Sequence, residues 1–401
     1  MLNPRLEELA DYAFPRLARL LAPLDPPPAL APIDLSIGSP MHPTPKLLTD
    51  TLAEYGHLWN RYPPVIGTAA FREAAAGWLG RRYRLPEGTL DPERHLLAVA
   101  GTKEALFLIA QAIMPGGLAG DWAGERPAVL MPNPFYNVYQ GAAVMAGAEA
   151  VMLPATAETR YLPDLDRLGP ALLARTVAFY LCSPTNPQGA AADLDYLTRA
   201  LELARRHEFL LIVDECYAEL YTREPPAGAL QAALRLGGGF EGLMVFHSLS
   251  KRSSAAGLRS GFVAGDPALI AGFARLRNYA AAVQPLPVLA AATALWQDEA
   301  HVEANRALYR QKFDLAEERL GGRFGFYRPD GGFFLWLTVG DGEDATRRLW
   351  TEAAIKVLPG AYLGRPDEQG RNPGDAAIRV ALVHDLATTD TALRRIAETL
   401  E

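Results

Sequence analysis

The 401-residue sequence contains little cysteine, and its histidines are few and scattered. The two cysteines, Cys182 and Cys216, lie far apart, each beside an apolar run. This pattern is typical of buried, reduced thiols in a cytoplasmic protein and argues against a disulfide framework or a cysteine-rich metal site. The seven histidines show no spacing typical of metal ligands, so we expect no bound metal.

An excess of positive charge and long hydrophobic runs are also missing. The sequence has 39 Lys and Arg against 46 Asp and Glu, and it has no basic tail or stripe, which argues against a nucleic-acid partner. The N-terminal segment carries acids and lacks an apolar core, so it is unlike a signal peptide. The most apolar long stretch, residues 280–296, is too short and too interrupted by Pro285 and Pro287 to span a bilayer. We therefore expect a cytoplasmic protein with no membrane partner.

What is present is enough apolar sequence for a large core, since 49% of the residues are hydrophobic. Between residues 96 and 265, continuous apolar strands alternate with helices. This alternation predicts an α/β fold with a mostly parallel sheet covered on both faces. The predicted strands are residues 96–100, 128–132, 150–154, 176–182, 209–214, 243–247 and 262–265, and the predicted helices between them include 103–114, 137–147 and 193–207.

The flanking sequence predicts a second, smaller α+β domain. We expect residues 1–40 to form an N-terminal arm and part of this small domain, 41–285 the large domain, and 286–401 the rest of the small domain. A plausible cap, Thr44, precedes Pro45 in the first position of one helix. The other predicted elements are helices at 5–21, 44–55, 69–83, 267–278, 288–320 (long and bent), 343–354 and 388–400, and strands at 33–38, 332–339 and 377–383.

The stretch from Leu243 to Gly265 carries the strongest chemical signal. Its first strand leads to Ser248 and Lys251, and Arg259 follows eight positions after the lysine. A lysine among small residues at a strand end suits a Schiff base, because desolvation lowers its pKa. A serine hydroxyl and an arginine suit a phosphate. Pyridoxal 5′-phosphate (PLP) needs both, whereas the simpler alternative is a solvated basic turn.

Other polar residues follow predicted strands in the same way, and ligands of open α/β sheets bind beyond the carboxyl ends of the strands. Asp214 could keep a pyridine nitrogen protonated, and Asn186 and Tyr217 could donate to the phenolic oxygen of the cofactor. Taken singly, each has a simpler explanation: a capping Asp, an Asn–Pro turn and a packed Tyr. Their common placement after strands favours a shared site.

Three further features fit the same cofactor or its substrate. Residues Gly101, Thr102 and Lys103 lie between a strand and a helix that we expect to begin near Lys103, where backbone N–H groups bind phosphate. Tyr136 could stack on the pyridine ring. Arg379 interrupts an apolar strand; if buried it needs an anion such as a substrate carboxylate, and if exposed it marks an edge strand.

Together these motifs resemble the class I and II aminotransferases of the type I PLP fold, from LSIGSPMHPTP to AIRVALV. The most specific piece, SLSKRSSAAGLRSG, resembles the lysine signature of that family. The resemblance implies PLP as cofactor, amino-acid and 2-oxo-acid substrates, and a homodimer with shared active sites. It implies catalytic roles for Lys251, Asp214 and Tyr217, and substrate contacts from Gly38, Asn186 and Arg379. Tyr62 of a neighbouring subunit would contact the cofactor phosphate. The other implied cofactor contacts come from Gly101, Thr102, Lys103, Tyr136, Asn186, Asp214, Tyr217, Ser248, Lys251 and Arg259.

A narrower resemblance is to the N-succinyldiaminopimelate aminotransferases of bacterial lysine synthesis, in segments such as MPNPFYNVYQGA, DECYAELY and VLPGAYLGR. It implies transfer of an amino group between glutamate and N-succinyl-2-amino-6-oxopimelate. Arg160, Arg328 and the loop 360–375 are candidates for contacting the succinyl group. Ser254-Ala255-Ala256 departs from the usual pattern, so we expect differences in loop rigidity or substrate fit there.

Several alternatives stay open from the sequence. One is an aminotransferase for aspartate, alanine or unacylated diaminopimelate. Another is a PLP-dependent C–S lyase, which shares nearly every residue named. A PLP-binding regulator would need a DNA-binding module, for which the segment before SIGSP is too short and too rich in proline.

Overall fold

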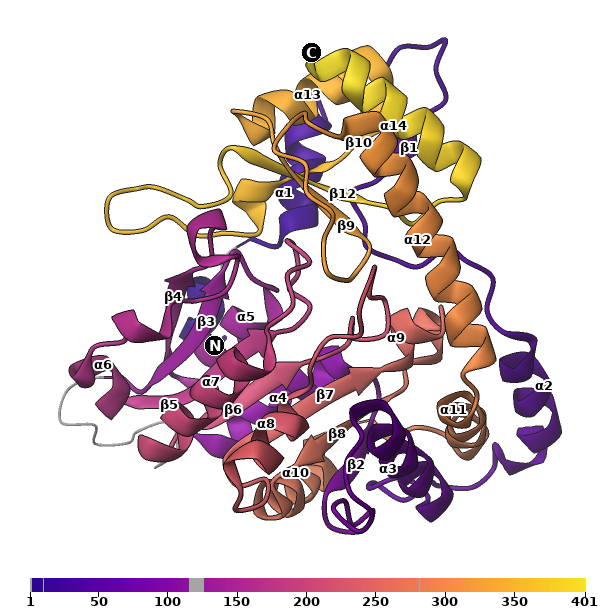
Figure 1. Cartoon of the computed structure of the whole chain (residues 1–401), viewed down its shortest axis with the longest axis vertical. Coiled ribbons are helices and arrows are strands. Elements are labelled where there is room, and N and C mark those ends of the chain that lie inside the picture. Colours follow the sequence, from indigo (N-terminus) through magenta and orange to yellow (C-terminus); the bar gives the residue numbers. More distant parts are fainter. Residues whose placement is uncertain (1, 10, 115–125, 281) are drawn as a thin grey trace.

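A seven-stranded sheet forms the centre of the larger part of the molecule (Figure 1). The computed structural model describes residues 2–9, 11–114, 126–280 and 282–401. Six of the seven strands run in one direction and β8 runs in the other, so the predicted α/β fold with a mostly parallel sheet is confirmed. The strand order is β2 (Leu96–Val99), β8 (Gly261–Gly265), β7 (Leu243–Ser248), β6 (Leu210–Asp214), β5 (Thr176–Cys182), β3 (Ala128–Asn133) and β4 (Glu149–Pro154).

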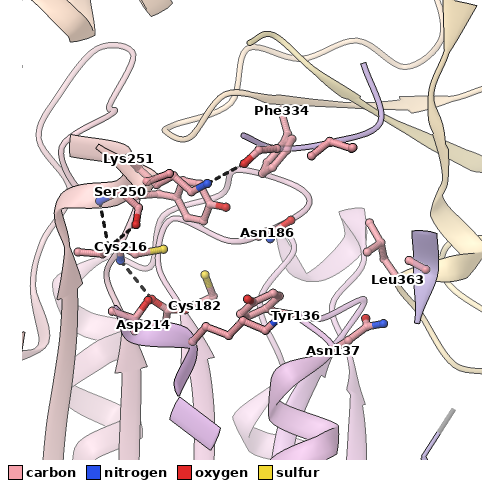
Figure 2. A pocket seen from close by; sticks show the side chains of 18 of the residues that line it. Tyr136, Asn137, Cys182, Asn186, Asp214, Cys216, Ser250, Lys251, Phe334 and Leu363 are labelled. Atoms are coloured by element: carbon pink, nitrogen blue, oxygen red, sulfur yellow. Dashed lines mark hydrogen bonds between the residues drawn. The ribbon is translucent and has the colours of Figure 1, made fainter. Parts of the chain in front are cut away.

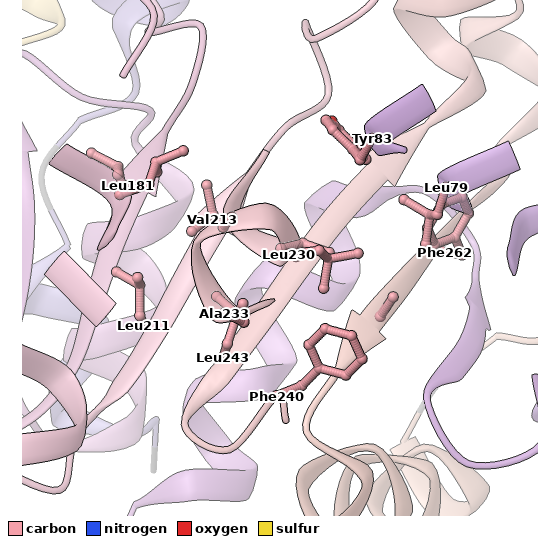
Figure 3. Close-up of a cluster of buried hydrophobic side chains, with 14 of the residues drawn as sticks. Leu79, Tyr83, Leu181, Leu211, Val213, Leu230, Ala233, Phe240, Leu243 and Phe262 are labelled. Carbon is pink, nitrogen blue, oxygen red and sulfur yellow. The ribbon is translucent and has the colours of Figure 1, made fainter. Parts of the chain in front are cut away.

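Helices cover both faces of this sheet because successive strand side chains point to opposite sides. In β6, Leu211 and Val213 face one core and Leu210 and Ile212 face the other. Figure 3 shows the first core, where side chains of Leu79 and other helical residues pack on the strands. That face carries α3 (Ala69–Tyr83), α7 (Leu194–Arg206), α8 (Ala229–Leu236) and α11 (Leu286–Gln297), and the opposite face carries α4 (Thr102–Ile113), α5 (Val138–Ala146) and α10 (Pro267–Ala280).

The smaller part combines both ends of the chain. Strand β12 (Ala377–Ala381) lies between β11 (Leu358–Pro359) and β9 (Phe334–Thr338) in an antiparallel sheet. Strand β1 (Ile33–Asp34) pairs in parallel with β10 (Ile355–Lys356), which ties the N-terminal segment to the C-terminal third. The helices here are α1 (Ala13–Leu21), α12 (Ala300–Leu320), α13 (Gly342–Ala353) and α14 (Leu386–Leu400). The domain boundaries at 40 and 285 stay a prediction.

The remaining elements are short, and α9 holds the lysine of the signature stretch. They are the helices α2 (Lys46–Glu54), α6 (Pro170–Ala174) and α9 (Leu249–Arg252), with the 3-10 turns η1 (Pro4–Glu8), η2 (Tyr55–Leu58), η4 (Ala157–Thr159), η5 (Leu165–Arg167), η6 (Ala256–Leu258) and η7 (Gly360–Tyr362). Among the described ranges, no helix has the length and apolar character needed to cross a membrane.

Several predicted elements are wrong in extent. The helix predicted at 5–21 is a short 3-10 turn followed by α1, and position 10 lies outside the described residues. The helix predicted at 288–320 is two helices, because Asp298 is extended and its carboxylate accepts from the backbone N–H of His301. Pro45 rather than Thr44 is the N-cap of α2, which begins at Lys46. The first strand is only Ile33–Asp34, β9 is only Phe334–Thr338, and β12 ends at Ala381.

Candidate active site

A cavity of about 430 Å³ lies beyond the carboxyl ends of β5, β6 and β7, where the large sheet meets the smaller part (Figure 2). Eleven of the thirteen residues predicted for the site line it. The shared position after parallel strands therefore brings residues far apart in sequence into one place. The eleven are Gly38, Thr102, Lys103, Tyr136, Asn186, Asp214, Tyr217, Ser248, Lys251, Arg259 and Arg379.

Lys251 lies on α9, directly after β7. The Ser248 hydroxyl accepts from the backbone N–H of Ser250 at 3.1 Å and so caps this short helix. The ammonium group of Lys251 donates to the carbonyl oxygen of Gly38 at 2.6 Å. Burial, reinforced by the nearby Arg379 and Arg259, lowers the pKa of Lys251 to about 8. A lysine with this pKa is partly neutral near neutral pH and can act as a nucleophile or base.

Asp214 ends β6 and is only 3% exposed. The hydroxyl of Tyr139 donates to its Oδ2 at 3.0 Å, and the backbone N–H of Cys216 donates to its Oδ1 at 3.3 Å. Burial raises the pKa of this carboxyl group, and within the described ranges it forms no ion pair. A buried carboxylate without a cationic partner fits a protonated ring nitrogen.

Arg259, α4 and Ser248 form an anion-binding corner. Arg259 has φ 56° and donates to the Ala256 carbonyl at 2.8 Å. Gly101 has φ 87°, a backbone conformation that favours glycine, and a Cβ atom there would lie 2.2 Å from the Arg259 guanidinium and displace it. The helix α4 begins at Thr102, one residue before the predicted start, and presents free backbone N–H groups. Hydroxyl, guanidinium and N–H donors together fit a phosphate group.

Arg379 lies on β12, the middle strand of the small sheet, and is 4% exposed, so the edge-strand alternative is wrong. It donates to the Asn186 side-chain oxygen at 3.1 Å and to the Ser36 carbonyl at 2.8 Å. Burial lowers its pKa to about 10. In the part of the chain that the structure describes, no carboxylate pairs with it and its Nε has no hydrogen-bond partner, so its position fits an anionic ligand.

Two predicted residues do not line the cavity. Gly101 lies behind Arg259 and acts through the close approach described above. Tyr62 is fully exposed, and its contact with a neighbouring subunit stays a prediction.

The comparisons with known proteins decide the family. Residues 31–396 match the family described as aminotransferase class I and II. The chain belongs to this aminotransferase family. Its members use pyridoxal 5′-phosphate, and the buried lysine, the unpaired carboxylate and the anion-binding corner fit that cofactor.

Individual relatives of this aminotransferase differ in the substrates they are named for. It is 35% identical to a 4-dedimethylamino-4-oxo-anhydrotetracycline transaminase of Streptomyces rimosus, over 84% of the chain and 87% of that protein. It is 30% identical to an LL-diaminopimelate aminotransferase of Syntrophobacter fumaroxidans, over 98% and 97%.

Among solved structures, an aminotransferase of Neisseria meningitidis is 39% identical with a TM-score of 0.93, and the match covers 100% of both chains. A probable N-succinyldiaminopimelate aminotransferase of Thermus thermophilus is 27% identical with a TM-score of 0.82, over 96% of this chain and 100% of that one.

The structure also shows residues of the aminotransferase site that the sequence analysis missed. Tyr139 lies in the first turn of α5, and its ring centre is 5.7 Å from that of Tyr136, so its nearness to Tyr136 in the sequence is the signal that could have found it. Tyr12 and Phe14 come from the N-terminal segment, and no local pattern marks them. The others on the cavity wall are Ala13, Ile37, Asn137, Cys182, Cys216, Ser250, Ala256, Phe334, Leu358 and Leu363.

The two cysteines are both free, and both line this cavity. Cys182 is buried as predicted, whereas Cys216 is partly exposed. Burial raises the pKa of both thiols well above the ordinary range, so they are protonated near neutral pH.

The loop that departs from the usual pattern is held by specific contacts. Ser254 has φ 48°, and its hydroxyl donates to the carbonyl oxygen of His42 at 2.7 Å. The hydroxyl of Ser253 lies 2.8 Å from Nε2 of His301. Side-chain hydrogen bonds therefore fix this loop beside Lys251.

Proposed function

We propose that this aminotransferase moves an amino group between glutamate and N-succinyl-2-amino-6-oxopimelate, giving 2-oxoglutarate and N-succinyl-LL-2,6-diaminopimelate. The observation that carries the proposal is the charge of the cavity. Four cationic side chains line it, whereas Asp214 is the only carboxylate among the described residues there; the four are Lys103, Lys251, Arg259 and Arg379. Lys251, Arg259 and Lys103 would be taken up by bound PLP, whose ring nitrogen would pair with Asp214. The part of the wall left to the substrate then carries the cation Arg379 and no described carboxylate, which favours substrates with several carboxylates.

The site residues divide the work of the reaction. Bound PLP withdraws electrons from the α-carbon of the substrate. Asp214 would keep the ring nitrogen protonated, and Tyr217 and Asn186 would donate to the phenolic oxygen. Lys251 Nζ would take and hold the proton from the α-carbon, as its lowered pKa allows.

The substrate would be positioned from the small sheet. Arg379 would bind the α-carboxylate in a bidentate manner, and the Asn186 oxygen that accepts from Nη1 orients its guanidinium. Tyr12, Phe14 and Leu363 on the cavity wall would exclude water from the reacting atoms.

A second candidate substrate is unacylated LL-diaminopimelate, favoured by the 30% identity over 98% of the chain to an LL-diaminopimelate aminotransferase. Its distal end carries an ammonium group as well as a carboxylate. Acylation removes that positive charge and adds a carboxylate, which suits a cationic wall better.

The reverse reaction tests the two candidates against each other. Holoenzyme and 2-oxoglutarate are mixed with either N-succinyl-LL-2,6-diaminopimelate or LL-diaminopimelate, and glutamate formation gives kcat/KM for each. A value at least tenfold higher for the succinylated donor supports the proposal. A higher value for the unacylated donor supports the second candidate, and no glutamate from either contradicts both.

We also propose that the enzyme is a homodimer in which Tyr62 contacts the cofactor phosphate of the other subunit, because this tyrosine is fully exposed in the single chain. Mixing a Lys251→Ala variant with a Tyr62→Phe variant checks this. In mixed dimers one of the two sites holds both substitutions and the other holds neither, so activity above that of either variant is expected.

A further inference from the structure

We propose that Arg16 and Arg365 form a distal anion subsite, which binds the carboxylates of the substrate at the end remote from the reacting carbon. This inference rests on the proposed function and deepens it. It names the residues that would distinguish an N-succinylated substrate from an unacylated one.

The two arginines line a second cavity, of about 320 Å³, beside the first. Tyr12 and Leu363 belong to the wall of the catalytic cavity, and Asp11 and Gly364, the next residues along the same two segments, belong to the second one. Figure 2 shows Leu363 at the edge of the catalytic cavity, away from Lys251. A long substrate could therefore extend from one cavity into the other.

Neither arginine has an acidic partner in the described part of the chain. Arg16 packs on the ring of Tyr362, with its guanidinium carbon 3.9 Å from the ring centre. Arg365 donates to the Gln140 side-chain oxygen at 2.7 Å and to the Gly364 carbonyl at 2.8 Å, and its buried Nε has no partner. Burial and the nearby Arg16 both lower the pKa of Arg365, so the two cations lie close enough to repel each other.

The acid in this cavity does not neutralise them. Asp11 forms an ion pair with Arg19, on the same helix as Arg16. The remaining polar side chain there, Asn372, donates to the Ala361 carbonyl and accepts from the backbone N–H of Gly374. The guanidinium groups of Arg16 and Arg365 are both partly buried and repel each other, and an anion bound between them would stabilise both.

The other arginines predicted to contact the succinyl group are already paired. Arg328 pairs with Asp314 and Glu317. Arg160 is exposed and lies 3.6 Å from a carboxylate oxygen of Asp193. Of the three sequence candidates, only the loop 360–375 supplies an arginine without a carboxylate partner at the cavity.

The chemistry of the two candidate substrates differs at this place. The distal end of LL-diaminopimelate carries one carboxylate and one ammonium group, a net charge of zero, and its ammonium would be repelled. The N-succinyl derivative carries two distal carboxylates and no ammonium. Two guanidinium groups could bind one carboxylate each.

Calorimetry on the holoenzyme with its cofactor in the aminated (pyridoxamine) form, which cannot accept an amino group from these amines, tests the subsite through binding rather than turnover. The probes are N-succinyl-LL-2,6-diaminopimelate and its N-acetyl analogue, which lacks only the terminal carboxylate and its methylene. We expect the wild type to bind the succinyl compound about tenfold more tightly, and the Arg16→Ala/Arg365→Met double variant to lose that preference. Arg365→Lys, which keeps the charge but not the bidentate geometry, should show an intermediate preference.

The matched control is Arg371→Ala, in the same loop but outside the cavity and paired with Asp367. It should keep the wild-type preference. If the double variant keeps the preference, or the wild type has none, the subsite is overturned. If the preference depends on the two arginines but 2-oxoglutarate receives no amino group from the succinyl compound, the subsite holds and the proposed function fails.

Discussion

The floor and the roof of the catalytic cavity are built differently. The floor consists of residues at the ends of β5, β6 and β7 with the start of α4, including Asp214 and Lys251. The roof consists of Tyr12, Ala13, Phe14, Leu358 and Leu363, from segments of the small sheet or beside it. The backbone hydrogen bonds of a buried sheet hold the floor residues in place, whereas contacts between the two ends of the chain hold the roof residues in place. We infer from this difference that the floor carries out the chemistry and that the roof selects the substrate.

The largest expected effect comes from removing the floor's nucleophile. Lys251→Ala should lower kcat by several orders of magnitude, because the proton acceptor at the α-carbon is lost. It should also abolish the visible absorbance band of the bound cofactor that shifts with pH. Spectra and single-turnover rates measure both, and an unchanged spectrum would contradict the role of Lys251.

Asp214→Ala should slow loss of the α-proton by roughly 100- to 1000-fold while leaving some PLP bound, because a preorganised charge is removed from a buried site. Stopped-flow measurement of the half-reaction with glutamate checks this. Tyr139→Phe, which leaves the carboxylate and removes one donor, is the matched control and should have a much smaller effect. Near-normal rates in Asp214→Ala would refute the assignment.

Arg379→Ala should raise KM for amino acids by roughly 10- to 100-fold, since charge-assisted hydrogen bonds contribute about 1.5–3 kcal/mol. Cofactor affinity should change much less. Steady-state kinetics and a PLP titration separate the two, and equal losses of both would place Arg379 outside the substrate-binding wall.

A change in the roof should have a smaller and more selective effect. Phe14→Ala removes an aromatic wall and should change the ratio of kcat/KM between two amino donors by only a few-fold, about 1 kcal/mol of differential binding. The visible spectrum of the bound cofactor should stay as in the wild type. A large change in that spectrum would contradict the inference that the roof selects the substrate without taking part in the chemistry.

The smallest effect is on stability and follows from the pKa of Lys251, which is about 8 in the fold against 10.5 in the unfolded chain. Between these values the unfolded state binds more protons, so the contribution of Lys251 to stability rises with pH from about 8 to 10.5. Below pH 8 its charged form is disfavoured in the fold. In the cofactor-free protein, Lys251→Met should therefore raise the thermal midpoint at pH 7, and the gap should narrow by pH 10. A gap independent of pH would contradict the burial of this charge.

The sequence predicted the floor of the cavity but not its roof. The floor could be predicted because each of its residues directly follows an apolar strand, and parallel strands bring their carboxyl ends to one edge. The roof could not, because Tyr12 and Phe14 carry no local pattern and reach the cavity through contacts across most of the chain. The contact between Arg379 and Asn186 is of the same kind, since 193 positions separate them. The break at Asp298 was missed because no proline or glycine marks it: it is formed by a hydrogen bond that the Asp298 side chain accepts from the backbone N–H of His301.

The pairing of β1 with β10 has a consequence for the order in which the protein can be completed. The residues of the central sheet, 96–265, can find one another as soon as they leave the ribosome. Residues 33 and 34 are made much earlier but must wait for residues 355 and 356. This segment is thus synthesised before the central sheet and is placed after it. A nascent chain that already contains every strand of the central sheet still lacks the partner that holds this segment over it.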